Sequence, residues 1–311
     1  SLGATGYSDR LLKATVGEEI RGLRISLAQT VRNPDELESV LKQRTVELER
    51  FYGLDNNWYQ RIPDSVLRLV RFDLGNARTL RTTDGSSSVA GILFERLPRT
   101  AVLLTSAMVI TALLGIGIGA RLSSNPGNKI DRIFSYFSAI SFALPAWWAG
   151  ILLILIFSFK LGILPGGGMY STPPPEDLLH KFLDLIWHAC LPIITMVLVS
   201  VGSWTYTVRT MMMNTAQEDF VTVARAKGLS ESIVMRRHIL RVAAPPILTG
   251  LILGLASSVS GAILTETVFN WPGMGRLYYD AILAVDEAVV VALSFMFTLI
   301  YVSARFLLEI L

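Results

Sequence analysis

Residues that carry out catalytic chemistry are scarce in this chain. Among 311 residues it has a single cysteine, Cys190, and three histidines, so it forms no internal disulfide and shows no metal-ligand spacing. The Walker A pattern and the G-x-S-x-G and H-E-x-x-H patterns are missing as well. We therefore expect no catalytic residue, no cofactor and no metal on this chain, and no ATP bound through a phosphate loop.

Charge is also sparse. Charged residues make up 17% of the chain and hydrophobic residues 51%, which is the composition of a membrane protein. The net charge of +3 gives no reason to expect a nucleic-acid partner. Five apolar stretches approach the about 17–25 residues that cross a lipid bilayer as a helix. These stretches are 100–120, 133–159, 185–208, 242–265 and 288–304.

Residues 1–97 differ from the rest, because acidic and basic residues are mixed there in near balance. The pattern predicts a charged helix over 30–50, with Pro34 near its start and Asn33 as its cap. An aromatic-rich turn and a short amphipathic helix containing Val66, Leu67 and Val70 should follow. We divide the chain into a region 1–97 outside the membrane and a transmembrane domain 98–311.

Basic residues predict the orientation in the membrane. The loop 121–132 holds three of them and the loop 209–241 holds six, whereas the loops on the opposite side hold one or two each. Basic loops stay on the cytoplasmic side, so both of these loops should be cytoplasmic and residues 1–97 should lie outside.

The stretch 217–246 is too basic for hydrocarbon and too long for an unstructured connection. It predicts two short helices broken at Gly228, with Phe220, Val223 and Ala224 on one face of the first and Ser230 capping the second. Such an element offers a small rigid projection to a partner protein. The charge pattern alone also permits a loop that rests on anionic lipid headgroups.

A second motif lies beyond this loop, in the sequence ETVFNWPGMG at 266–275. Glu266 stands at the outer end of an apolar stretch, where an unpaired carboxylate is costly. Two roles remain open for it. It lines the external mouth of a pathway, or it pins the turn that follows. Pro145, inside the stretch 133–159, predicts a helix kink.

These strings resemble permease subunits of ABC importers, most closely the B-type subunit of the dipeptide/oligopeptide (Opp/Dpp) family. The matching strings are RLPRT at 96–100, ARAKGL at 224–229, ETVFNWPGMG at 266–275 with Asp286 beyond it, and YGLD at 52–55. Four segments depart from the usual pattern. Asn57 stands where proline is common, and Phe72 where glycine is usual. Thr222-Val223-Ala224 stands where a family consensus has Glu-Ala-Ala, and His238-Ile239-Leu240-Arg241 where many importers have I-x-L-P.

The resemblance implies an all-α type I ABC importer transmembrane domain with five spans in residues 98–311 and a sixth span ahead of residue 1. It implies a permease that moves peptides across the cell membrane by alternating access. The implied partners are a second homologous permease, two ATP-binding subunits carrying ATP and Mg²⁺, an extracytoplasmic binding protein and the lipid bilayer.

The resemblance also assigns two groups of residues. The loop that couples to the ATPase would comprise Ala224, Arg225, Ala226, Lys227, Gly228 and Leu229. The external-mouth or turn motif would comprise Glu266, Trp271, Pro272, Gly273, Gly275 and Asp286.

Two alternatives stay open. In the first alternative, the chain belongs to the same kind of ABC importer, but the transported solute is an oligosaccharide or another small molecule. A self-contained secondary transporter or channel is the other alternative, but it should show ion-coupling residues within its spans. Here His188 is the one such group within the stretch 185–208.

Overall fold

The computed structural model describes residues 7–27, 34–51, 54, 71 and 73–310. Within these residues the regular structure is helical, and one isolated bridge joins Asn76 to Ser88. The helical segments are α1 (Tyr7–Leu27), α2 (Pro34–Phe51), α4 (Val89–Ser124), α5 (Lys129–Ala143), α6 (Ala146–Leu153), π-helical η2 (Ile154–Lys160), α7 (Leu178–Ala216), α8 (Asp219–Ala226), α9 (Glu231–Ile233), π-helical η3 (Val234–Ile239), α10 (Leu240–Gly261), α11 (Ile263–Val268), α12 (Met274–Leu283) and α13 (Glu287–Ile310). The predicted all-α class is confirmed.

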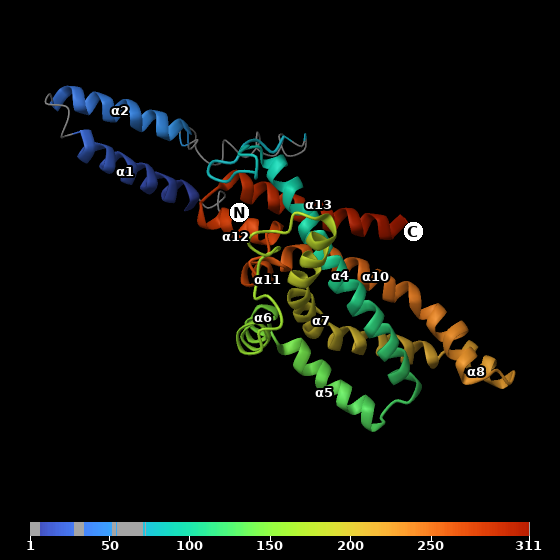
Figure 1. Ribbon diagram of the computed structural model, residues 1–311. Helices are drawn as coiled ribbons and strands as arrows, with labels where there is room; N and C mark the ends of the chain where they lie inside the picture. Colours follow the sequence, from blue (N-terminus) through green and yellow to red (C-terminus); the bar gives the residue numbers. More distant parts are fainter. Residues whose placement is uncertain (1–6, 28–33, 52–53, 55–70, 72, 311) are drawn as a thin grey trace. The chain divides into compact units, whose positions relative to one another are not determined.

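The chain divides into two compact units, which we describe separately. The first comprises residues 1–93 and 280–295, and in it α1 packs against α2 through buried Val16, Leu41 and Leu48 (Figure 1). Helix α2 confirms the predicted charged helix and begins at Pro34, a residue whose fixed φ suits the first helical position.

Several sequence predictions fall outside the described residues. They are the cap at Asn33, the amphipathic helix around Val66, Leu67 and Val70, and the motif positions Tyr52, Gly53, Asp55, Asn57 and Phe72.

The second unit comprises residues 94–279 and 296–311 and contains most of the apolar helices. Helices α4, α7 and α13 have 36, 39 and 24 residues and are apolar enough to cross a membrane. The pair formed by α5 and α6–η2 passes the same test together. The described residues thus hold three membrane-crossing candidates, or four with this pair. Helix α10 covers most of the predicted stretch 242–265, and the number of five spans stays a prediction.

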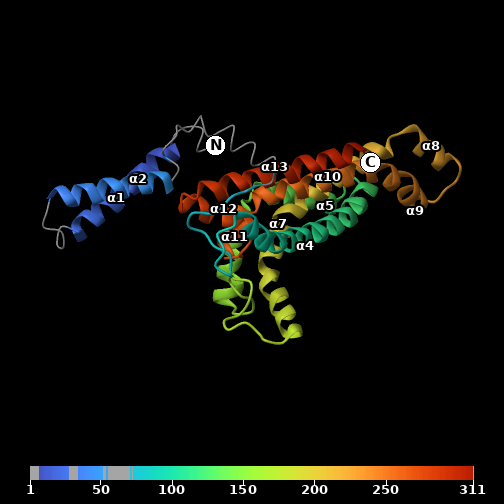
Figure 2. The same ribbon diagram turned by 90° about the horizontal axis from the view of Figure 1, so that it is seen from above.

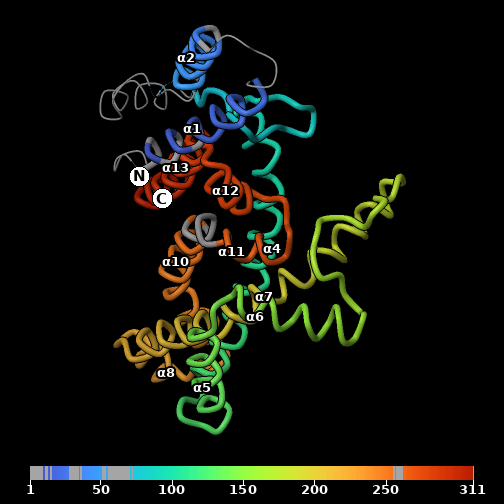
Figure 3. The backbone as a smooth tube through the Cα atoms, turned by 90° about the vertical axis from the view of Figure 1, so that its left-hand side faces the viewer, coloured from blue at the N-terminus to red at the C-terminus, as the bar shows by residue number. Residues whose placement is uncertain are grey.

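The predicted span 133–159 is broken rather than kinked. Leu144 adopts an extended conformation (φ −80°, ψ 121°), and α5 and the α6–η2 segment diverge by 98°. Proline disfavours helical geometry in the residue before it and lacks the N–H that would continue the helix, so Pro145 ends α5 and starts α6. In Figure 1 α6 is seen end-on beside α5, and Figure 3 shows the same turn of the chain.

Helices α5 and α7 pack at very short range. Ser138 Oγ donates a hydrogen bond to the Gly202 carbonyl at 2.8 Å, and Ser141 Oγ donates to the Leu198 carbonyl at 2.7 Å. A Cβ at Gly202 would stand 2.7 Å from Ser141 Cβ, so glycine is required there. Small residues that let two backbones approach are typical of helix packing in membranes.

A buried ion pair between Asp131 and Arg209 joins α5 and α7 near the start of α5. Arg209 donates to both carboxylate oxygens of Asp131, at 2.5 and 2.6 Å, and the two side chains are 16% and 4% exposed. Asp131 also accepts from the backbone N–H of Gly127 at 2.7 Å. The pair therefore ties the loop before α5 to the end of α7.

The loops of this unit gather at its ends as the basic residues predicted. The loop before α5 lies at the same end as α8 and α9 in Figures 1, 2 and 3. The loop 161–177 instead meets the motif at 266–275, because Gly168 N–H donates to the Phe269 carbonyl at 2.8 Å. The two loops predicted to be cytoplasmic are thus on one side.

Replacing Asp131 by alanine should lower the free energy of unfolding by about 3–5 kcal/mol, because Arg209 would keep a buried charge without its partner. Thermal unfolding of the purified protein in detergent measures this. The matched control is Glu309→Ala, which removes an exposed pair with Arg305 and should cost less than about 1 kcal/mol. Equal effects of the two variants would contradict the structural role of the pair.

Candidate functional site

The basic loop between α7 and α10 folds as a compact helical projection. Helix α8 is followed by Gly228, whose φ of +75° is a conformation that glycine adopts without steric cost. Ser230 occupies the N-cap position of α9, although its side chain makes no capping hydrogen bond. The break at Gly228 is confirmed, and the predicted cap is correct in position only.

One side of this projection is buried in the protein. Val221 and Ala224 of α8 pack with Val234 and Ile239 of η3, against apolar residues of α7 and α10. These supporting residues are Val208, Met212, Ala243 and Ile247. Helix α8 therefore shares one apolar cluster with η3, α7 and α10.

Ala224 does not lie on the surface of the projection. Its side chain is 4% exposed, while Phe220 and Val223 are 39% and 52% exposed. The prediction grouped these three residues on one face, but the buried face is formed by Val221 and Ala224. The small size of Ala224 therefore lets α8 pack closely on its support.

The exposed side carries the rest of the predicted coupling residues. Arg225, Ala226, Lys227 and Gly228 are exposed, and Leu229 is half-buried. Arg225 bonds to Glu231 at 2.9 Å across the Gly228 turn, which links α8 to α9. The projection thus presents apolar and basic groups on a frame held by an apolar core and an ion pair.

The second motif forms a tight turn around Glu266. Its side chain is fully buried, and its oxygens accept from Thr100 Oγ1 at 2.7 Å and from the Arg276 N–H at 3.0 Å. Thr100 Oγ1 accepts in turn from the Met274 N–H at 2.7 Å. Glu266 therefore binds the backbone of the turn, the geometry expected of a structural role.

The turn has the hydrogen bonds of a Schellman motif. Trp271 N–H donates to the Glu266 carbonyl at 2.8 Å and Asn270 N–H to the Thr267 carbonyl at 3.1 Å. Asn270 takes the left-handed position with φ +51°, which asparagine tolerates better than most residues.

The other motif residues complete the turn. Trp271 is fully buried and donates from Nε1 to the Arg99 carbonyl at 3.1 Å. The Pro272 carbonyl faces the Arg96 and Arg99 guanidinium groups at 3.4 and 3.5 Å. At Gly275 a Cβ would stand 2.8 Å from the backbone of Ile263, so the turn has no room for a side chain there.

Asp286 belongs to a different cluster, within the first unit. Its Oδ2 accepts from the backbone N–H groups of Arg78, Thr79 and Leu80 at 2.8, 2.9 and 3.3 Å, and from Thr79 Oγ1 at 3.1 Å. Asp286 is fully buried and follows Val285, which has φ +53°. The carboxylate thus anchors the segment 78–80 at the end of α12.

Two groups were missed as site residues. Thr100 is the main partner of Glu266, and the string RLPRT at 96–100 pointed to it. The Asp131–Arg209 pair was harder to predict from the sequence, where the one indication is an acidic residue, Asp131, within a basic loop.

A chain of long apolar helices with an exposed basic projection is typical of a multi-pass membrane protein. The family model for the inner membrane component of binding-protein-dependent transport systems matches residues 111–311, more than half of the chain. The chain belongs to this family.

The relatives are transport permeases. The oligopeptide transport system permease protein AppB of Bacillus subtilis is 29% identical over 262 residues, which cover 84% of this chain and 80% of that protein. The di/tripeptide transport system permease protein DppB of Pseudomonas aeruginosa is 33% identical over 255 residues, covering 76% and 74%.

Solved structures share the fold. The chain resembles the MetNI methionine ABC transporter in an inward-facing conformation, with a TM-score of 0.55 and 16% identity. The match covers 72% of this chain and 98% of that one. The likeness shows the fold of a type I ABC importer transmembrane domain, as expected.

Replacing Gly273 by alanine should destabilise the protein by about 1–3 kcal/mol, because the new Cβ would collide with the carboxylate of Glu266 and with Thr100 Oγ1. Thermal unfolding in detergent measures this. Gly117→Ala in α4 is the control, since no atom lies within 4 Å of its Cβ position, and it should stabilise by about 0.5–1 kcal/mol. If Gly273→Ala left the free energy of unfolding unchanged, the stability of the turn would not depend on this packing.

Proposed function

We propose that the chain is the permease subunit of an ATP-driven importer of di- and oligopeptides. The projection carried on α7 and α10 is the observation that supports it most, because a transport subunit without ATPase motifs needs a rigid contact with an energy source. The peptide substrates rest on the relatives, two of which are named as oligopeptide and di/tripeptide permeases.

The partners follow from this assignment. A second homologous permease completes the pathway, an extracytoplasmic binding protein delivers the peptide, and two ATPase subunits bind ATP and Mg²⁺. The loop 209–241 faces the cytoplasm and residues 1–97 face outward, in agreement with the distribution of basic residues. The transmembrane domain then comprises residues 98–311.

In this mechanism the ATPase subunits move the projection, and the projection moves the helices. Phe220 and Val223 offer exposed apolar contacts, and Arg225 and Lys227 surround them with positive charge. Because Val221 and Ala224 belong to an apolar cluster that includes residues of η3, α7 and α10, displacement of α8 moves this cluster and with it both long helices. Alternation between outward- and inward-facing pathways follows from that displacement.

Replacing Gly228 by valine should uncouple ATP hydrolysis from transport. Valine at φ +75° adds about 1–3 kcal/mol of strain and should change the angle between α8 and α9. Peptide uptake per ATP hydrolysed, measured in vesicles with the assembled transporter, should fall while the variant is still inserted. Val223→Glu should do the same by placing a charge on an exposed apolar contact.

Gly162→Val is the matched control, because Gly162 has φ +65° and equally open surroundings in the loop on the opposite side. It should retain the normal ratio of uptake to hydrolysis. A normal ratio of peptide uptake to ATP hydrolysis in both Gly228→Val and Val223→Glu would contradict the coupling role of the loop.

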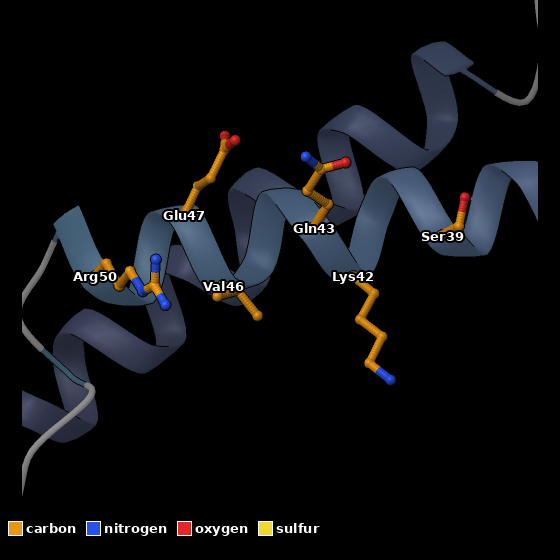
Figure 4. Close-up of a pocket in the computed structure, with 6 residues that line it drawn as sticks. All are labelled: Ser39, Lys42, Gln43, Val46, Glu47 and Arg50. Carbon is orange, nitrogen blue, oxygen red and sulfur yellow. The ribbon is translucent and has the colours of Figure 1, made fainter.

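Cysteine labelling tests the orientation. Figure 4 shows Ser39 pointing to the same side of α2 as Gln43 and Glu47, on an exposed part of the helix. In a Cys190→Ser background, Ser39→Cys should react with an impermeant maleimide added outside cells, and Ser232→Cys, exposed on α9, should react only after the membrane is opened. The reverse pattern would overturn the topology.

A further inference from the structure

A cavity of about 210 Å³ lies among α4, α7 and α10 in the second unit. Its lining residues include Met108 and Thr111 from α4, Met196, Ser200, Ser203 and Trp204 from α7, and Gly250 and Gly254 from α10. These positions fall within the predicted spans 100–120, 185–208 and 242–265, and these spans place the cavity at membrane depth.

Two glycines fix the wall formed by Trp204. A Cβ at Gly115 would collide with the indole ring, with Cγ at 3.2 Å, and a Cβ at Gly250 would stand 3.2 Å from Cη2. The ring is thus held between α4 and α10. Gly254 has no neighbouring atom within 4 Å of its Cβ position, so the edge of the cavity on α10 is open.

Among the residues that the structure describes, the lining combines hydroxyl groups with adaptable apolar groups and contains no charged side chain. Ser203 Oγ donates to the Ser200 carbonyl at 3.0 Å and keeps its lone pairs for a further donor, and Ser200 is exposed. A peptide group supplies an N–H donor for these hydroxyl oxygens and a carbonyl acceptor for the Ser200 O–H.

Methionine side chains are common on surfaces that bind varied ligands, because the unbranched thioether adapts its shape. Met108 and Met196 give the cavity this property. Its volume is also informative, since a cavity of about 150 Å³ takes up benzene. The space thus suits one large side chain and its adjoining peptide group, but not a whole oligopeptide.

We propose that this cavity receives one side chain and the adjoining peptide group of a transported peptide midway across the membrane. The inference rests on the proposed peptide import and adds the position and residues of a substrate site. Ser200, Ser203 and Thr111 contact the peptide group, while Met108, Met196 and the Trp204 ring surround the side chain. The absence of charge in the lining favours peptides of varied sequence over one charged substrate.

Protection of a cysteine tests the occupant. In a Cys190→Ala background of the assembled transporter, the reaction of Ser200→Cys with N-ethylmaleimide is followed with and without the tripeptide Ala-Phe-Ala. At about four times the dissociation constant, the peptide should slow labelling about fivefold, because protection follows 1 + [L]/Kd. Thr210→Cys, further along α7 and outside the cavity, should label at the same rate in both conditions.

Blocking the cavity gives a second, independent measurement. Ser200→Trp should lower uptake of Ala-Phe-Ala relative to Ala-Gly-Ala by about tenfold, the lower end of the discrimination that a hydrophobic pocket provides. Thr210→Trp should leave this ratio unchanged. The ratio compares two peptides in the same vesicles, so the amount of assembled transporter cancels.

Three outcomes would overturn the inference. Labelling of Ser200→Cys that is unaffected by peptide, while the wild type imports Ala-Phe-Ala, shows that the peptide passes elsewhere. Slow labelling in the assembled transporter with or without peptide shows that the second permease covers the cavity. Failure of the wild type to take up either tripeptide overturns the proposed function itself. This outcome is distinguished from failure of the cavity proposal because it is seen without any variant.

Discussion

The rest of the structure depends on the cost of an unpaired polar group away from water. Each buried carboxylate described above is bound several times, and each joins segments far apart in the sequence: Glu266 joins α11 to Thr100 and the start of α12, and Asp131 joins the loop before α5 to α7. Removal of one partner from such a group leaves a buried charge, which is far more costly than the net value of the pair. The same constraint explains His188, whose Nδ1 lies 2.9 Å from the Asp184 carbonyl and 3.2 Å from its carboxylate.

The cost of an unpaired buried polar group also explains the residues of the motif at 266–275. The turn reverses the chain within a few residues, so its N–H groups cannot bond within a helix, and the Glu266 carboxylate with Thr100 accepts them instead. Asn270 supplies the left-handed residue, and Gly273 and Gly275 leave room for the carboxylate and for the Ile263 backbone. The hydrogen bonds and the close packing of the turn therefore account for these motif residues.

Periodicity and breakers in the sequence predicted the helical class, α2 and the break at Gly228, because these depend on local backbone preferences. They did not predict which side of α8 is buried, since Val221 and Phe220 are adjacent on an eight-residue helix and both are apolar. Pro145 was recognised, but whether a proline kinks a helix or ends it depends on the surrounding packing. The partners of Asp286 and Arg209 lie 208 and 78 residues away, a separation that no local pattern resolves.

Helix α7 brings the features of the second unit together over a short distance. Trp204 lines the cavity, Arg209 binds Asp131, and Val208 and Met212 support α8. From Trp204 to Met212 the helix rises about 12 Å, at about 1.5 Å per residue. Ser138 and the ion pair hold α5 to the same stretch, so α5 and α7 are linked close to the residues that support α8. In the proposed mechanism, a movement of the projection therefore reaches the cavity wall along α7.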